Sequence, residues 1–305
     1  MKPQSALTWL VPLIAVIAII TSGVSLFSQG GEGSFPFTTL HGNTVEIHGQ
    51  GIYQHDSRFV AALNIGTDAV TLFVSIPLLL VSYLLYLRGS LRGSLFMIGM
   101  LMYFLYIGVT YTFSVVFNPL FLFYVALFST SLFATIIALT TFDIQMLSSK
   151  ISAALPRRGM AIFMFTAGLG TLMIWLSELI GPSLAGQAPA NLGPYTTMFT
   201  HGFDSAVITP ATVLTGIYLW RRKSLGYLLV APLLILCTLI GVVVLAQTIS
   251  QSLAGIVFPI GVYIGMIGSW VLMGAFAIGL MLAFFRSLSG NRHSQEIIHK
   301  AGAIS

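Results

Sequence analysis

The 305-residue chain is 56% hydrophobic and only 7% charged, and its mean hydropathy is +0.95. A water-soluble fold of this size cannot bury so much apolar surface. The composition therefore excludes a soluble globular protein and predicts an all-α polytopic integral membrane protein. The single cysteine, Cys237, excludes an internal disulfide and a metal site built from several cysteines.

Apolar runs close to the roughly 20 residues that a spanning helix needs recur along the chain. We expect about eight transmembrane helices, at Leu7–Phe27, Phe59–Leu87, Leu95–Val116, Leu120–Thr140, Ala161–Leu179, Ser205–Trp220, Tyr227–Ala246 and Leu253–Phe285. The first run, which follows Lys2, also fits a cleavable signal peptide. Its length and the lack of an Ala-x-Ala site after it favour an uncleaved anchor.

Basic residues are distributed unequally between the two sides of this arrangement. Twelve of the thirteen Lys and Arg residues fall on one side, and only Arg58 falls on the other. Because basic loops mark the cytoplasmic side of a membrane protein, we expect both termini in the cytoplasm and the chain in the cell membrane. Topology thus accounts for the net charge of +5, and no nucleic-acid partner is expected.

Two stretches of the chain are similar to each other. One runs from Gly66-Thr67-Asp68 through Pro77 to a basic turn at 88–93, and the other from Gly202-Phe203-Asp204 through Pro210 to a basic turn at 221–226. With four spans in each half, a duplication keeps the orientation of the copies, so the sequence predicts two parallel four-helix repeats. The first repeat covers 1–150 with an outer loop at 28–58, and the second covers 151–290 with an outer loop at 181–200. A short cytoplasmic tail follows at 291–305.

The first outer loop contains two short alternating runs around a Gly-Asn turn, Phe35–Leu40 and Thr44–His48. This pattern predicts a small β-hairpin between the first two spans. Alternation places Glu46 and His48 on one face of the second strand, and Val45 and Ile47 on the face that packs onto the helices.

The same loop gathers residues that are able to bind metal. Imidazole and carboxylate groups suit zinc or another transition metal, and the candidates for a divalent metal are His41, Glu46, His48, His55 and Asp56. Histidines in a loop at a membrane surface are otherwise simply solvated.

Two carboxylates are expected at the outer edge of the membrane. The 19 residues from Asp68 to Leu87 span roughly 28 Å at about 1.5 Å per residue, close to the thickness of about 30 Å of a hydrocarbon core. Asp204 lies at a similar depth. Ionisable groups at this depth are costly unless they face the protein interior or a wet cavity, so we expect both to bind substrate. Asp204 also fits a helix N-cap.

Three further residues are expected to line the substrate site. Asn64 is four residues before Asp68 on the same helix face and would orient that carboxylate or share its ligand. Glu178, His201 and Asp204 would form a second polar pocket if their helices are neighbours. Glu178 also fits a side chain that reaches to the outer surface.

An eight-span protein of two four-helix halves resembles the haem A synthases in plan only. That family binds haem through histidines of its transmembrane helices, and this sequence has none within its expected spans. No haem is therefore expected, and no nucleotide-binding motif is present.

Three classes of function fit these features. The first is a permease for a small solute or lipid-like molecule, with a site in the outer half of the membrane. The second is a membrane-embedded enzyme that uses the outer histidines and carboxylates, with or without metal. The third is an assembly subunit without chemistry of its own. The expected partners are the lipid bilayer and a small-molecule or lipid ligand.

Overall fold

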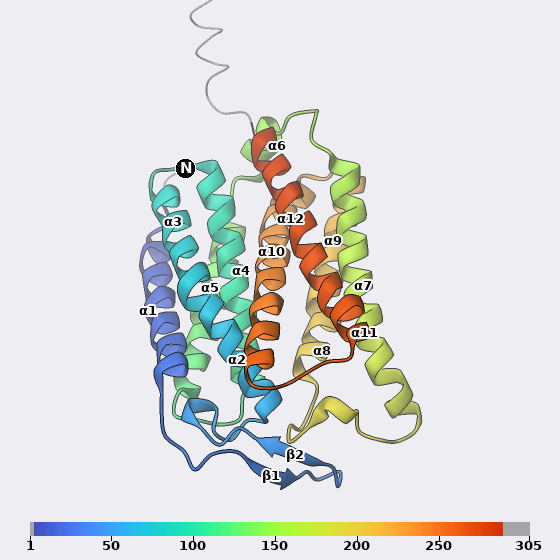
Figure 1. Cartoon of the computed structure of the whole chain (residues 1–305). Helices are drawn as coiled ribbons and strands as arrows, with labels where there is room; N and C mark the ends of the chain where they lie inside the picture. Colours follow the sequence, from blue (N-terminus) through green and yellow to red (C-terminus); the bar gives the residue numbers. More distant parts are fainter. Residues whose placement is uncertain (1–2, 289–305) are drawn as a thin grey trace, which may run out of the picture.

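Long helices run side by side in the computed structural model, and a two-stranded sheet lies across one end of them (Figure 1). The structure describes residues 3–288. The expected tail at 291–305 and three of the basic residues, Lys2, Arg292 and Lys300, lie outside this range.

The first half of the chain begins with a helix, the sheet and three further helices. These elements are α1 (Ser5–Phe27), β1 (Phe35–Thr38), β2 (Thr44–Ile47), the 3₁₀ turn η1 (Gly51–Tyr53), α2 (Arg58–Val70), the π-helical segment η2 (Thr71–Ser75), α3 (Ile76–Leu87), α4 (Leu91–Ser114) and α5 (Phe121–Thr140). Helix α2 continues through η2 into α3.

The short helix α6 (Ile144–Lys150) ends the first half, and the helices and turns that follow it belong to the second half. They are α7 (Arg157–Leu184), the 3₁₀ turn η3 (Ala190–Leu192), α8 (Phe199–Phe203), the π-helical segment η4 (Asp204–Ile208), α9 (Thr209–Trp220), α10 (Ser224–Leu253), α11 (Ile260–Val262), the π-helical segment η5 (Tyr263–Ile267) and α12 (Gly268–Ser287).

Seven helices within residues 3–288 are long and apolar enough to cross a membrane, and they indicate an integral membrane protein. They are Ser5–Phe27, Arg58–Leu87, Leu91–Ser114, Phe121–Thr140, Arg157–Leu184, Ser224–Leu253 and Ile260–Ser287. The eighth predicted span, Ser205–Trp220, forms part of the continuous helical run Phe199–Trp220. This run contains Asp204 and four threonines and is less apolar than the others.

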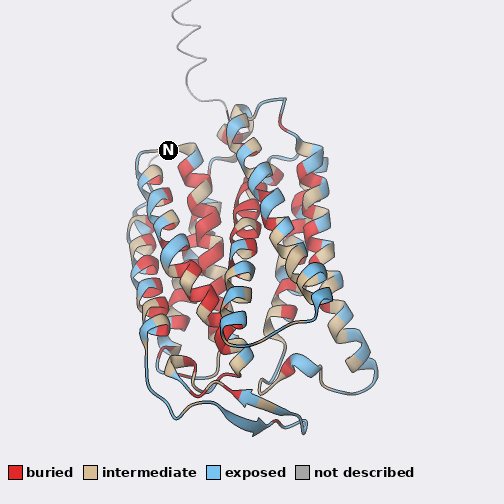
Figure 2. Ribbon diagram, in the orientation of Figure 1, coloured by how far each residue is buried: buried red, intermediate tan, exposed pale blue. Residues whose placement is uncertain are grey.

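Helices α4 and α10 form the centre of the bundle and pack against each other. Figure 2 shows buried residues concentrated along both of them. Around α4 lie α3 and α5, and around α10 lie α2, α9 and α12. Apolar side chains also cover much of the outside, including Trp9 on α1 and Leu272 on α12, as expected where helices face lipid tails.

The predicted hairpin is confirmed. Strands β1 and β2 pair antiparallel, with Phe35 opposite Ile47 and Thr38 opposite Thr44. Ile47 is buried, whereas Glu46 is exposed on the other face. Arg58 anchors the sheet to the bundle because its guanidinium donates to Glu46 Oε2 at 2.8 Å and to the carbonyl of Ala254, after α10, at 2.5 Å.

Nine of the ten described Lys and Arg residues lie at the end of the bundle opposite the sheet, which we call the basic end. A β-bridge and hydrogen bonds join separate segments of the chain at this end. Ile151, before α7, forms a β-bridge with Leu288, after α12. The Ser152 amide donates to the Ser287 carbonyl at 3.0 Å, and Arg92 donates to the Leu288 carbonyl at 2.8 Å.

A π-helical segment precedes each of the two matching prolines, Pro77 and Pro210. Segment η2 ends two residues before Pro77, and η4 ends two residues before Pro210. A proline lacks an amide hydrogen, and its ring collides with the carbonyl four residues earlier, so the wider π turn accommodates it. The matching features of the two segments are 133 positions apart: 71 and 204, 77 and 210, and 88 and 221.

The turns that follow share the same hydrogen bonds. In the first, Gly89 has φ +71° and its amide donates to Tyr86, while Ser90 donates to Leu85. In the second, also 133 positions later, Arg222 has φ +59° and its amide donates to Leu219, while Lys223 donates to Tyr218. A left-handed residue of this kind closes a helix and usually is glycine.

One of the glycines on η5 and α12 lies at a close helix–helix contact. A Cβ on Gly274 would lie 2.9 Å from the Cα of Gly241, so α10 and α12 approach closely at this point. Gly265 and Gly279 have open space around them instead.

Replacing Arg222 by glycine should stabilise the protein by up to about 1 kcal/mol, because a side chain in the left-handed region costs roughly 1 to 2 kcal/mol. Thermal unfolding in detergent measures the change. The control is Arg221→Gly, which removes the same charge from a neighbour with φ −81°. Equal effects of the two substitutions would contradict the backbone explanation.

Candidate functional site

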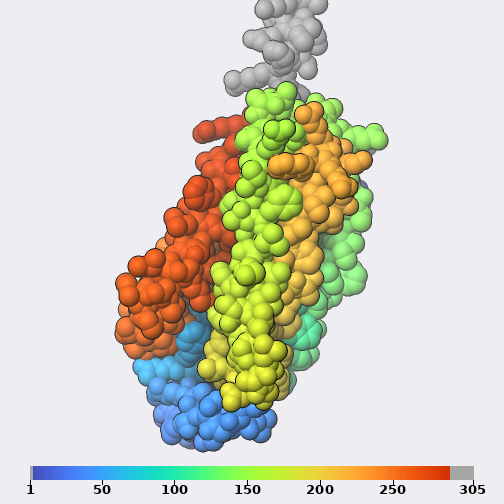
Figure 3. Space-filling view, turned by 90° about the vertical axis from the view of Figure 1, so that its right-hand side faces the viewer, coloured from blue at the N-terminus to red at the C-terminus, as the bar shows by residue number. Residues whose placement is uncertain are grey.

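A cavity of about 300 Å³ lies in the half of the bundle next to the sheet, which we call the hairpin end. Residues of α2, α4, α7, α8, α10 and the run α11–α12 line it, so both halves of the chain contribute. Helices α7 and α12 lie on the same face of the molecule in Figure 3, with the outer loop 28–58 across the end.

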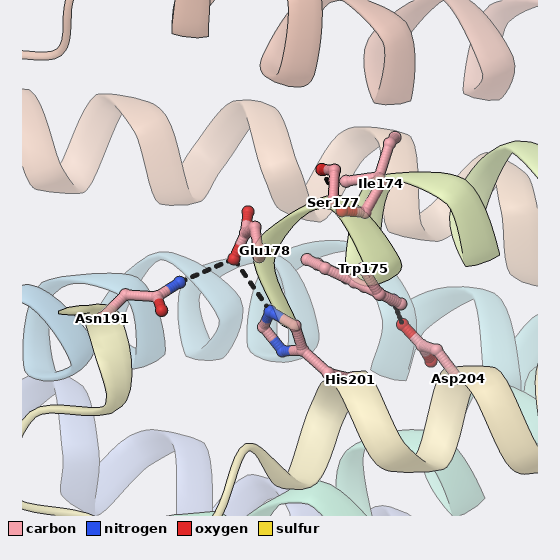
Figure 4. A network of polar contacts seen from close by, with 7 residues as sticks. All are labelled: Ile174, Trp175, Ser177, Glu178, Asn191, His201 and Asp204. Atoms are coloured by element: carbon pink, nitrogen blue, oxygen red, sulfur yellow. Dashed lines mark hydrogen bonds and ion pairs between the residues drawn. The ribbon is translucent and has the colours of Figure 1, made fainter. Parts of the chain in front are cut away.

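Two helix faces meet at one wall of this cavity. Trp175 and Glu178 are one turn apart on α7, and His201 and Asp204 are one turn apart at α8 and η4. The helices run antiparallel, so that Glu178 faces His201 and Trp175 faces Asp204 (Figure 4). His201 Nε2 lies 3.0 Å from Glu178 Oε2, and the indole Nε1 of Trp175 donates to Asp204 Oδ2 at 3.0 Å.

Trp175 contacts both Asp204 and His201, the partner of Glu178. Its ring packs against the imidazole of His201, with centroids 4.0 Å apart and planes inclined by 38°, while its indole nitrogen donates to Asp204. Glu178 also accepts from the amide of Asn191 at 2.7 Å. The wall therefore holds a paired acid, Glu178, and a more deeply buried acid, Asp204.

Four residues that line the cavity carry a buried polar atom without a hydrogen-bond partner among the described residues. These atoms are Asn64 Nδ2, Thr110 Oγ1, Asp204 Oδ1 and Gln251 Nε2. Buried polar groups in proteins are nearly always paired, and each unpaired group costs about 1 to 3 kcal/mol. Such groups, gathered around one cavity, are suited to binding a polar ligand.

Asp204 is not the helix N-cap that its sequence context predicted. The helix has already begun at Phe199 and continues through η4. The carboxylate instead accepts from Trp175 and, at 3.5 Å, from the hydroxyl of Tyr106 on α4. The earlier helix start frees the side chain to face the cavity.

Asp68 lies outside the lining of the cavity, although it was expected to bind substrate. Its carboxylate is completely buried and accepts from three hydroxyl groups: Ser25 of α1, Tyr53 at 2.6 Å and Tyr111 of α4 at 3.0 Å. Tyr111 lines the cavity and bonds Asp68 behind it. These hydroxyls satisfy Asp68 and tie α1, η1 and α4 to α2.

Asn64 lines the cavity but is not hydrogen-bonded to Asp68 in the described structure. Asn64, Asp68, His55 and Asp56 therefore do not share one pocket. His55 is exposed, and Asp56 is engaged elsewhere.

Asp56 links the loops 28–58 and 181–200 next to the cavity. It accepts from the hydroxyl of Tyr195 at 2.9 Å and from the amide of Val116 at 3.1 Å, and Tyr195 in turn accepts from the Ser57 amide at 3.2 Å. Tyr195 also lines the cavity. Burial raises the pKa of Asp56 to about 7, and burial with the nearby carboxylate raises the pKa of Tyr195.

The expected metal ligands are dispersed. Within residues 3–288, no group of three or more His, Cys, Asp or Glu side chains is close enough to hold a metal ion. His41 is exposed in the hairpin turn, and Glu46 is paired with Arg58, whose hydrogen bond lowers the pKa of Glu46. Burial lowers the pKa of His48. The structure therefore does not assemble a metal site from the outer loop.

The sequence suggested aromatic residues around Glu178, His201 and Asp204 but did not identify which ones. Trp175, Tyr106 and Trp270 all line the cavity, and the rings of Trp175 and Trp270 lie 6.0 Å apart between centroids. The available signal was spacing, because Trp175 precedes Glu178 by three residues and so shares its helix face. Trp270 and Tyr106 come from distant helices, and no local pattern links them to Asp204.

Neither the protein-family models nor the curated proteins and solved structures compared with this chain match it. The geometry of the cavity is therefore the basis for a functional proposal.

Replacing Asp68 by alanine should lower the stability by about 3 kcal/mol, because the hydroxyls of Ser25, Tyr53 and Tyr111 lose their buried acceptor. Thermal unfolding in detergent measures this loss. Asp204→Ala is the matched comparison and should cost less, since its carboxylate has fewer bonds to lose. A larger cost for Asp204→Ala would refute the structural role of Asp68.

Asp56 should make the protein less stable as the pH rises from about 4 to about 7. Its folded pKa is raised to about 7, so in this window the folded chain keeps a proton that the unfolded chain releases. Asp56→Asn stays neutral and should flatten the decline, whose limit is about 1.4 kcal/mol per pH unit. Melting temperatures across the window test this, with exposed Glu32→Gln as control. An unchanged slope in Asp56→Asn would show that another group is responsible.

Proposed function

We propose that the protein is a membrane permease for a small solute and that the cavity at the hairpin end is its solute site. The observation that carries the proposal is a cavity between the two halves whose walls hold unpartnered polar atoms. An assembly subunit would have no reason to keep such groups buried, and the dispersed outer acids and histidines give no support to a metal enzyme.

We further propose that Phe199–Trp220 is an eighth membrane crossing. The start of α7 and the end of α12 are fastened together at the basic end. The chain between them must therefore cross the bundle an even number of times, and α7, α10 and the run Ile260–Ser287 account for three crossings. Packing of α9 against both α7 and α10 supports the fourth.

The two-repeat interpretation has support in the constant spacing of 133 positions. It relates the π segments, the prolines and the left-handed residues of the basic turns. Glycines behave in the same way: a Cβ on Gly93 would meet Leu85, and one on Gly226 would meet Tyr218 and Leu219. A duplicated unit explains these matches more simply than chance, because none of them is required by apolar composition.

The orientation follows from the basic end, which we assign to the cytoplasm by the positive-inside rule. The cavity then lies in the outer half of the cell membrane. Two of the three described π segments, η4 and η5, contribute residues to its wall, including Asp204 and Met266. Such segments are frequent at functional sites, and here they are the positions at which the wall is best able to change shape.

The experiment has two steps. Purified protein is incubated with a metabolite extract, and retained compounds are identified by mass spectrometry; the retained compound is then tested for uptake into proteoliposomes. Val244→Trp fills the cavity and should abolish retention, whereas Val242→Trp, on the exposed face of the same helix, should not. Retention that survives Val244→Trp, or a retained compound that is never taken up, would refute the proposal.

A further inference from the structure

We infer that the ligand of the cavity is a small organic cation, an alkyl- or arylalkylamine, with its ammonium group bonded to Asp204 beside the rings of Trp175 and Trp270 and its apolar part against the aliphatic side chains of the lining. This inference names the substrate class and rests on the proposed function.

The charges of the wall favour a cation. Its acidic residues are Asp204 and Glu178, and of the described residues that line the cavity none is Lys or Arg. The nearest basic side chain along α2, Arg58, is directed to Glu46 and the Ala254 carbonyl. An anionic ligand would therefore meet uncompensated like charge, which in a medium of low dielectric constant is strongly unfavourable.

Asp204 offers an acceptor for the cation. It is about 97% buried, at 3% relative exposure, and Oδ1 has no partner among the described residues. Oδ2 is already held by Trp175 and Tyr106. A buried carboxylate needs a counter-ion or further donors to offset its desolvation, and an ammonium group supplies both through one N–H bond to Oδ1.

The aromatic rings favour an organic cation over a metal ion. Trp175 and Trp270 lie 6.0 Å apart with planes inclined by 36°, and indole rings attract ammonium groups through their faces. A metal ion would need several oxygen ligands. Glu178, the other acid of the wall, is instead taken by His201 and Asn191.

The remaining wall and the volume limit the size of the ligand. The lining also includes the apolar side chains of Ile240, Val243, Val244, Met266 and Ile267. A volume of about 300 Å³ is at the lower limit of ligand pockets, which range from roughly 300 to 1,000 Å³. One positive charge and one compact apolar group fit this space.

The test compares three probes of similar shape and different charge: phenethylamine, phenethyl alcohol and phenylacetate. Trp9 and Trp220, which are exposed, are replaced by Phe, so that Trp175 and Trp270 remain as fluorescent reporters. We expect saturable quenching by the amine, affinity at least about tenfold lower for the alcohol, and none for phenylacetate.

Asp204→Asn should reduce the affinity for the amine about tenfold or more and leave that for the alcohol unchanged. Asp143→Asn is the control, because this acid caps α6 at the basic end and asparagine caps equally well. If Asp204→Asn does not fold, Trp270→Leu is used instead. It should lower the affinity for the amine more than the affinity for the alcohol.

Three results would overturn the inference: equal affinity for amine and alcohol, an amine-to-alcohol ratio unaffected by Asp204→Asn, or no quenching by phenethylamine. Failure of the permease proposal is distinguishable. If the alcohol binds and Val244→Trp abolishes its binding, the assignment of a cationic ligand is wrong but the cavity remains the solute site. If Val244→Trp binds all probes as the unmodified protein does, the site itself is wrong.

Discussion

A carboxylate removed from water needs hydrogen-bond donors or a counter-ion, and this requirement organises the interior of the bundle. The chain buries Asp68 and Asp204 between helices that carry few other charges. Asp68 meets the requirement within the protein, through hydroxyl groups from three separate elements. Asp204 meets it only in part, since one of its oxygens has no partner in the described chain. The first acid is therefore a structural cross-link, and the second has capacity left for a ligand.

The two aspartates occupy non-equivalent positions, which limits the similarity between the two halves. The positions of the π segments, prolines and basic turns correspond at a constant spacing, but the two aspartates do not: at that spacing Asp68 corresponds to His201, and Asp204 to Thr71. Thr71 bonds Tyr103 in a filled interior, whereas Asp204 lies at a cavity. If the halves arose by duplication, both copies kept the π segment, the proline and the basic turn, whereas the aspartates of the two copies differ in position by about one helical turn.

Much of the fold could be predicted from the sequence because membranes impose simple rules. Long apolar runs gave the seven spanning helices, and period-two alternation gave the hairpin. Four of the five residues that the sequence suggested for the substrate site line the cavity, namely Asn64, Glu178, His201 and Asp204. The role of Asp68 could not be predicted, because it depends on tyrosines 15 residues before and 43 residues after it. The dispersal of the outer histidines likewise depends on contacts between loops, which local patterns do not encode.

The fastening of α7 to α12 at the basic end has a mechanical consequence. The bridge between Ile151 and Leu288 and the bond from Ser152 to Ser287 hold the two helices at one point, and their side chains meet again at Trp175 and Trp270. The two helices are thus joined at the basic end and in contact again at the two rings. The 18 residues from Arg157 to Trp175 give an arm of roughly 27 Å at about 1.5 Å per residue. A small rotation about the joined ends would therefore displace the two rings further than the helix ends at the base, and one of these rings, that of Trp175, is bonded to Asp204.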